Sequence, residues 1–374
     1  MGLYWRLATP TQDDRDKEDG EPFTWADYAA KIFGIALSRH KHASTFHFIN
    51  DRYDVPNSIK DMEHQRRSMN AAFNSGSCNV YIKRDQCIPK AQAFNSFFAN
   101  KGNKLRLQEF LWKEFKSLAL DKSQEFYYTT REKCVNLKTS AVSRELECHH
   151  HEADTRLFFH ASKVLSQCQN PIIIDSEDTD VFAIAAQAAH ELPGQMLLYR
   201  KGYLFDCHSM CSSELASVLV QLHAFTGADA ISGFFGHGKV SVLENAKKTP
   251  EFPSLISDLG LQVELCPELM QKLATFTIKC IYRDVSSQSL AAARSDKWLS
   301  MKRKSTERIP PDEDSLAQHC RRANYQCYIW RHFHEAEPPL SPLSHGWKFS
   351  STGLLEPVLS TLQANTRRCD SFTS

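Results

Sequence analysis

The feature that most limits what this 374-residue chain can fold into is an alternation of strand and helix patterns in its middle. EADTRLFFHASKVLSQ (152–167), VFAIAAQAAHEL (181–192) and SSELASVLVQLHAF (212–225) carry apolar residues at helical spacing. PIII (171–174) reads as a buried strand between the first two helices. Such alternation favours an α/β fold, Rossmann-like in type, whose mostly parallel sheet is covered by helices.

Other segments extend this pattern on both sides. MLLY and YLFD, separated by Arg200-Lys201-Gly202, predict a hairpin. Residues 23–37 show helical periodicity, and FHFIN (46–50) is typical of a short buried strand. Residues 91–117 predict further helices. The organisation we expect is a polar tail (1–22), an α/β domain (23–250), a helical extension (251–335) and a Pro/Ser-rich C-terminal tail (336–374).

Charge and hydropathy narrow the class of protein. Lys and Arg number 45 against 44 Asp and Glu, so any nucleic-acid-binding surface must be a local basic patch. No run of about 18 apolar residues suggests a membrane span, so we expect no membrane partner. The N-terminus has no apolar segment of signal-peptide length, and the 12 cysteines are scattered. We therefore expect reduced cysteines and an intracellular protein, nuclear rather than cytoplasmic.

Acidic residues stand where several buried elements begin or end. In open α/β sheets ligands bind beyond the carboxyl ends of the strands, where Asp51, Asp178 and Asp180 would project. Asp178 and Asp180 would face the same way if the backbone stays extended there. The complete candidate set is Asp51, Glu152, Asp154, Asp178, Asp180 and Asp229.

Each acid also has a purely structural interpretation. Acidic residues in loops and first helical turns commonly cap helices or lie on the solvated surface. For one motif alone that interpretation is favoured. The functional hypothesis rests on the combination of motifs.

Three stretches that contain these acids resemble segments of a known family. They are HEADTRLFFHAS, IIIDSEDTDVFAI and HAFTGADAISGFFGHGKV. They look like the core of the flap-endonuclease or XPG-type 5′ nucleases, within the PIN-like superfamily, and above all a divergent animal group associated with transposon-like genes. The motifs that carry the resemblance are Glu152-Ala153-Asp154, Glu177-Asp178-Thr179-Asp180 and Thr226-Gly227-Ala228-Asp229, and it covers residues 150–248.

The resemblance implies a nuclease that hydrolyses nucleic-acid phosphodiesters, either DNA or RNA. The six acids would be the metal ligands, and oxygen-only ligands select Mg²⁺ or Mn²⁺. Two ions would serve a two-metal mechanism. FINDRYDVPNSIKDMEHQRR resembles the family's V-F-D-G…K…R-R segment, which implies that Lys60 and Arg67 reach the scissile phosphate.

A glycine-rich turn follows Asp229. SGFFGHGK (232–239) resembles the family's helix–two-turn–helix element, in which Gly236 and Gly238 would let a phosphate approach the backbone and Lys239 would contact it. The alternative is a simple turn between two helices. The turn is one residue shorter than the family pattern and lacks its proline.

Departures from the family pattern keep other functions open. No strand with an aspartate precedes the helix at 23–37, and this favours a catalytically degenerate scaffold that binds nucleic acid or protein. A third alternative is a transposon-derived fragment that does not fold alone. His149, His150 and His151 invite a zinc hypothesis, but consecutive histidines point in different directions, which favours a polar junction.

Overall fold

Two compact units make up the protein in the computed structural model. Unit 1 comprises Met1–Leu219 and Ile329–Pro339, and unit 2 comprises Val220–Tyr328 and Leu340–Ser374. The boundaries therefore differ from the expected division at residue 250. The structure describes residues 1–11, 14, 22–55, 57–60, 80–89, 91–210, 212–283, 287, 289–302, 306–337 and 341–362.

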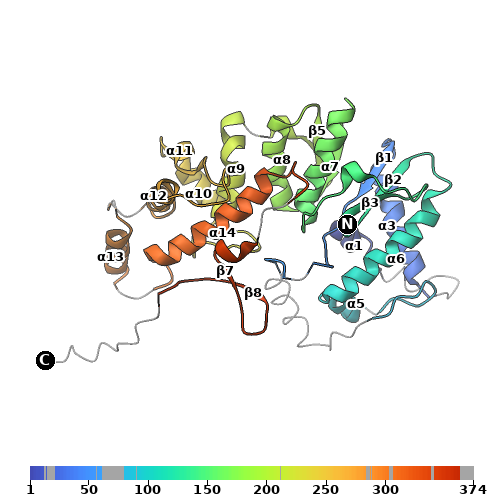
Figure 1. The fold of residues 1–374 in the computed structure, drawn as a ribbon, viewed down its shortest axis with the longest axis horizontal. Coiled ribbons are helices and arrows are strands. Elements are labelled where there is room, and N and C mark those ends of the chain that lie inside the picture. Colours follow the sequence, from blue (N-terminus) through green and yellow to red (C-terminus); the bar gives the residue numbers. More distant parts are fainter. Residues whose placement is uncertain are drawn as a thin grey trace. The chain divides into compact units, whose positions relative to one another are not determined.

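Unit 1 is a mixed α/β unit built from small sheets and helices (Figure 1). Its strands are β1 (Thr45–Phe48), β2 (Glu125–Thr130), β3 (Lys133–Asn136), β4 (Ile172–Asp175), β5 (Met196–Arg200) and β6 (Tyr203–Asp206). Its helices are α1 (Gly2–Leu7), α3 (Trp25–Arg39), α5 (Ala91–Phe97), α6 (Lys101–Ala119), α7 (Ala153–Gln167), α8 (Thr179–Glu191) and the first half of α9 (Ser213–Phe225). Short turns η1 (Arg144–Leu146) and η2 (Cys207–Ser209) complete it.

The strands form two three-stranded sheets, ordered β1-β2-β3 and β4-β5-β6. In each sheet the first pair is parallel and the second is antiparallel. The α/β class expected from the sequence is thus present. The described strands do not form the single, mostly parallel sheet that we expected. They form two separate sheets, and in each the second strand of the parallel pair continues through a hairpin into an antiparallel third strand.

The structure confirms the predicted hairpin after residue 196 and the predicted helix at residues 23–37. β5 and β6 are joined through Lys201 and Gly202, both at positive φ (50° and 81°), the backbone that tight hairpin turns require. α3 begins with a capping box, in which Thr24 accepts from the Asp27 N–H and the Asp27 side chain accepts from the Thr24 N–H. EFYYTT, which becomes β2, was not anticipated although its aromatic and β-branched residues favour a strand.

Aromatic side chains fill the core between α3, α6 and the first sheet. The Phe33 ring lies 5.2 Å from Phe115 and 5.0 Å from Phe126, measured between centroids. Phe48 of β1 lies 4.9 Å from Phe115. Burial of such rings, with offset and edge-to-face contacts, supplies much of the stability of this half of the unit.

The first residues differ from the polar tail that the sequence suggested. Residues 2–7 form α1, and Trp5 is buried with 3% of its surface exposed. The Tyr28 hydroxyl donates to the Trp5 carbonyl at 2.8 Å. Trp5 thus helps to dock this segment on α3, and composition averaged over residues 1–22 conceals it.

Asp175, at the end of β4, joins the two halves of unit 1. Its carboxylate accepts a 2.7 Å hydrogen bond from the Tyr4 hydroxyl and lies 3.1 Å from Arg39 Nε and 2.7 Å from His40 Nε2. The Arg39 guanidinium also stacks over the Tyr199 ring of β5. Helices α1 and α3 are thereby tied to the second sheet.

Residues 329–339 complete unit 1 although unit 2 separates them from it in sequence. The His149 N–H donates to the Ala336 carbonyl at 2.7 Å, and Phe158 and Phe333 pack with centroids 5.8 Å apart. His150 Nε2 lies 2.7 Å from the Glu335 carbonyl. Since a carbonyl only accepts, the imidazole carries its proton on Nε2.

Unit 2 is mainly helical. After the second half of α9 it contains α10 (Lys239–Ala246), α11 (Phe252–Ile256), α12 (Pro267–Phe276), the π-helical turn η3 (Thr277–Ile281), α13 (Leu290–Ser300) and most of α14 (Glu313–Arg331). Between residues 251 and 335 the described elements are all helices, joined by turns and loops. None of the described helices combines the length and apolar character needed to cross a bilayer.

The C-terminal segment is more ordered than the expected tail. A turn, η4 (Pro342–Ser344), leads into a two-stranded sheet of β7 (Trp347–Phe349) and β8 (Leu355–Pro357). Trp347 is buried, and the Arg322 guanidinium of α14 donates to the Val358 and Gly346 carbonyls. An arginine at a buried helix position holds the hairpin onto α14.

Replacing Gly260 by alanine should destabilise unit 2 strongly. Gly260 has φ +76°, and an added Cβ would lie 2.6 Å from the Cys327 carbonyl carbon and 2.7 Å from Tyr328 N. We expect a loss of about 3 kcal/mol in the free energy of unfolding, measured by urea titration. Gly202→Ala, at φ +81° with nothing within 4 Å, is the control and should cost about 1 kcal/mol. Equal losses in the two variants would contradict the packing argument.

His150 should make unit 1 sensitive to acid. Burial lowers its pKa from 6.5 to about 4 against the opposing hydrogen bond to Glu335, and no described group bonds the buried Nδ1 that must take the proton. Because the folded pKa lies below the unfolded one, the stabilisation is complete above pH 6.5 and is lost as pH falls towards 4. Between pH 7 and pH 5 we expect about 2 kcal/mol of unfolding free energy to disappear.

The variant His150→Gln tests this acid sensitivity because it keeps a donor for Glu335 and does not titrate. Urea titrations at both pH values should show a smaller pH-dependent loss than in the unaltered protein. His149→Gln is the matched control, since His149 is largely exposed and pairs with Glu337 at 3.3 Å. An unchanged pH dependence in His150→Gln would show that another group is responsible.

Candidate functional site

The start of α7 meets the loop that follows β1. Asp51 Oδ1 accepts a 2.7 Å hydrogen bond from the Ala153 N–H, one of the first amides of α7. The other oxygen, Oδ2, accepts from the Tyr53 hydroxyl at 2.9 Å, and Gln108 of α6 donates to the Asp51 carbonyl at 2.9 Å. Asp51 therefore caps α7 from a distant part of the sequence.

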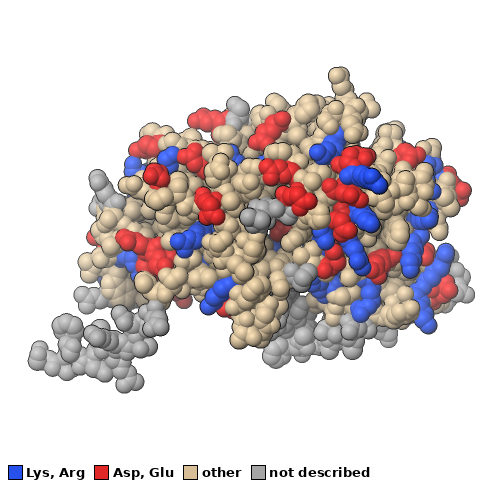
Figure 2. Space-filling view, viewed as in Figure 1, with Lys and Arg blue, Asp and Glu red and all other residues tan. Residues whose placement is uncertain are grey.

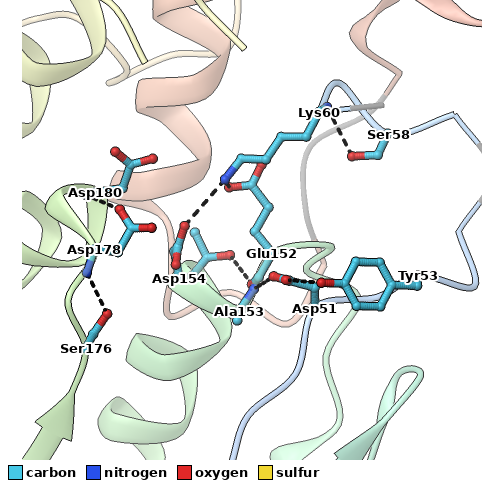
Figure 3. Close-up of polar contacts among 11 residues, drawn as sticks. Asp51, Tyr53, Ser58, Lys60, Glu152, Ala153, Asp154, Ser176, Asp178 and Asp180 are labelled. Atoms are coloured by element: carbon cyan, nitrogen blue, oxygen red, sulfur yellow. Dashed lines mark hydrogen bonds and ion pairs between the residues drawn. The ribbon is translucent and has the colours of Figure 1, made fainter. Parts of the chain in front are cut away.

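Lys60 lies between the two acids that open α7. Its Nζ is 3.0 Å from Glu152 Oε2 and 3.5 Å from Asp154 Oδ2 (Figure 3). Glu152 is the N-cap residue of α7 but its side chain makes no capping hydrogen bond. Its carboxylate is therefore directed at the ammonium group instead of at the helix backbone.

The start of α8 contributes two further acids. Asp178 is the N-cap, and its Oδ1 accepts a 2.9 Å hydrogen bond from the Asp180 N–H. Ser176 Oγ in turn accepts from the Asp178 N–H at 3.1 Å. The backbone becomes helical at Thr179, so the extended geometry on which a shared metal between Asp178 and Asp180 was conditional does not occur. Asp180 is buried with 7% exposure, whereas Asp178 is exposed.

The acids at the two helix starts influence one another electrostatically. Burial raises the pKa of Asp154 well above its ordinary value, and the charges of Asp178 and Glu152 add to this effect against the opposing charge of Lys60. Burial also raises the pKa of Glu152, with Asp180 adding to it. Four carboxyl groups thus share their surroundings with a single lysine.

Asp51 behaves in the opposite way. Burial alone would raise its pKa, but the hydrogen bond from Ala153 and the charge of Lys60 outweigh burial and hold the pKa below its ordinary value. Its ionised form is therefore part of the folded architecture.

Of the predicted site residues, the structure brings together Asp51, Lys60, the acids at the start of α7 and those at the start of α8 (Figure 3). We call Asp51, Lys60, Glu152, Asp154, Asp178 and Asp180 the acidic group. Arg67 lies outside the described residues. Asp229 belongs to unit 2, where it is exposed and lies in the tight turn between the bridged residues Ala228 and Ile231.

Glycines shape the backbone just before Asp229 and in the glycine-rich turn after it. Gly227 has φ +113°, and a Cβ there would lie 2.8 Å from the Gly233 Cα. Gly236 also has positive φ (79°), and Gly238 is the N-cap of α10. Lys239 points back to α9, where its Nζ lies 2.9 Å from both His223 Nδ1 and the His223 carbonyl. The described geometry supports the turn between helices, and a phosphate contact by Lys239 remains a prediction.

Sequence reasoning missed several residues that shape the acidic group. Arg156 is fully buried and donates to the Asn50 carbonyl at 3.0 Å, next to Asp51. Tyr53 and Gln108 fix Asp51. A charged residue on the apolar face of 152–167 was the available signal for Arg156.

The type of the candidate metal ligands favours a metal site, but the distances between them do not. Carboxylate oxygens are the ligands that Mg²⁺ and Mn²⁺ prefer. In the described part of the chain, however, no three His, Cys, Asp or Glu residues are close enough to hold an ion as they stand. The triple histidine forms no such group either. Lys60, rather than a third carboxylate, bridges Glu152 and Asp154.

No protein-family model matches the chain, and comparison with curated proteins and with solved structures finds no similar protein.

Asp154→Asn and Asp51→Asn should change stability in opposite directions. Asparagine removes the unfavourable buried charge of Asp154, so we expect about 1 kcal/mol more unfolding free energy at pH 7.5 without divalent ions. The same change at Asp51 weakens the acceptor of the Ala153 N–H and should cost about 1 to 2 kcal/mol. Urea titrations of both variants measure these effects, and destabilisation by Asp154→Asn would argue against the electrostatic picture.

Proposed function

We propose that the protein is a divalent-metal-dependent nuclease that hydrolyses phosphodiester bonds of DNA or RNA. The observation that supports this best is the convergence of Glu152 and Asp154 with Asp178 and Asp180, from two helix starts, beside Lys60. Five of the six acids singled out by the family resemblance lie in the same unit. The fold would be a divergent PIN-like, Rossmann-like domain, and β4-α8-β5 is its parallel strand–helix–strand unit.

Excess negative charge is the second support. Four carboxylates with one lysine, two of them with raised pKa, favour binding of a cation. Glu152, Asp154, Asp178 and Asp180 would hold Mg²⁺ or Mn²⁺, which supplies an activated water and charge stabilisation when bound. Holding it would require small side-chain movements, because Lys60 now bridges Glu152 and Asp154.

The chain's own groups would then have separate roles. Asp51 keeps the start of α7 in place through the Ala153 amide. Lys60, released from one carboxylate, would carry its positive charge to the non-bridging oxygens of the phosphate, where negative charge develops. A nuclear location belongs to the same proposal.

A catalytically degenerate scaffold is the second candidate, and a specific observation favours it. Lys60 already forms ion pairs with both Glu152 and Asp154, so a lysine charge occupies the place where a bound cation would sit. Such a protein would bind nucleic acid through the same unit without hydrolysing it. The presence or absence of metal-stimulated cleavage separates the two.

Asp180→Ala should abolish cleavage and leave the fold intact. The buried carboxylate is replaced without loss of a capping bond, since Asp178 supplies that cap. We expect cleavage of labelled single-stranded, flap and RNA substrates in Mg²⁺ or Mn²⁺ to fall by about a thousandfold or more. Circular dichroism and thermal unfolding check that the variant folds.

Glu177→Ala is the matched control for that experiment. Glu177 lies in the loop just before α8, and its carboxylate accepts from the Lys201 N–H of the β5-β6 hairpin at 2.8 Å. Its cleavage should match that of the unaltered protein. Full activity of Asp180→Ala would remove the proposed site. Absence of cleavage by the unaltered protein in both metals would favour the scaffold.

A further inference from the structure

Residues 80–119 carry a local excess of basic residues in a chain that is nearly neutral. Residues 80–119 contain eight Lys and Arg against three Asp and Glu, while the whole chain has a net charge of +1. α6 provides most of these basic side chains, and Figure 2 shows Lys and Arg gathered over the part of unit 1 in which Figure 1 draws α6. The local basic surface that a nucleic-acid-binding protein requires can therefore be located.

An exposed aromatic ring lies beside the start of α6. The Val80 N–H donates to Asn103 Oδ1 at 2.9 Å, which holds the chain segment against the first turn of the helix. The next residue, Tyr81, has 72% of its surface exposed, and Lys83 Nζ lies 5.9 Å from the ring centroid. Its exposed ring offers a face on which a nucleic-acid base can stack.

The same end of α6 adjoins the loop of the acidic group. Lys101 Nζ donates to the Val55 carbonyl at 2.7 Å, and Lys104 Nζ lies 5.0 Å from the Tyr53 ring centroid. Tyr53 in turn donates to Asp51. The basic and aromatic surface thus reaches the loop that carries Lys60 without leaving unit 1.

We propose that Tyr81, Lys83, Lys104 and Arg106, which we call the α6 rim, bind a single-stranded nucleic acid and lead it to the acidic group. Bases stack on exposed aromatic rings, and lysine and arginine contact the phosphates between them. A duplex hides its base faces and would leave Tyr81 without a role. The inference rests on the proposed function for what happens to the strand, and binding itself is tested separately.

Binding is measured by fluorescence anisotropy in EDTA, so that hydrolysis cannot occur. The probes are fluorescein-labelled oligothymidylate and oligouridylate of about 20 nucleotides, longer than one binding site of this type. Unlabelled duplex serves as competitor. The two probes separate DNA from RNA preference.

Tyr81→Ala should weaken binding about tenfold, as the loss of one stacked base does. Tyr81→Phe keeps the ring and should bind like the unaltered protein. Tyr203→Ala is the matched control, because Tyr203 is 70% exposed in the same unit but lies on β6. Its binding should not change.

Lys83→Ala with Lys104→Ala should also weaken binding about tenfold and reduce the slope of log K against log salt by about 1.4, for two phosphate contacts to a single strand. Lys113→Ala with Lys116→Ala removes the same charge from the exposed far end of α6. It is the control for a purely long-range effect, and its salt slope should stay unchanged.

Several outcomes overturn the α6 rim. One is that the unaltered protein binds neither probe. Another is that a control variant loses as much affinity as its rim counterpart: Tyr203→Ala as much as Tyr81→Ala, or the Lys113/Lys116 variant as much as the Lys83/Lys104 variant. The last is that unlabelled duplex at equal concentration displaces the probe completely. If the rim variants lose binding but the unaltered protein cleaves nothing, the rim stands and the nuclease proposal fails. If cleavage is normal and the rim variants bind normally, the nuclease proposal stands and the rim fails.

Discussion

The hydrogen bond from the Ala153 N–H to Asp51 is the interaction on which the acidic group depends. It joins residues 102 positions apart and aligns the loop after β1 with the start of α7. Because the first amides of a helix have no partner within it, a carboxylate is held there by both hydrogen bonding and the helix dipole. Lys60 reaches Glu152 and Asp154 because its loop is held at this point.

The acidic group is locally unfavourable and is stabilised by its surroundings. Buried carboxylates at two helix starts repel one another, and a single lysine offsets part of that repulsion. Caps at Asp51 and Asp178, and the buried Arg156 behind them, hold the backbone in spite of this. Clusters of buried acidic residues with perturbed pKa values are typical of functional sites.

Local patterns foretold the helices at 152–167 and 181–192, the β5-β6 hairpin and the acids at helix starts, because periodicity and turn chemistry are short-range signals. They left capping and metal binding open for Asp178, and the helical backbone from Thr179 onward decides in favour of the cap. The roles of Trp5 and of β7-β8 depend on packing partners far away in the chain. Only the family resemblance placed Lys60 at the same site as Glu152 and Asp154. The spacing of these residues along the sequence does not indicate it.

The segment 329–339 has a consequence for how the protein is made. Its contacts with His149, His150 and Phe158 belong to unit 1, yet the ribosome delivers it after the larger part of unit 2, residues 220–328, has been synthesised. Unit 1 therefore cannot close during translation in the usual order of one domain after the other. A fragment that stops at residue 219 would lack the Ala336 and Glu335 carbonyls that His149 and His150 contact.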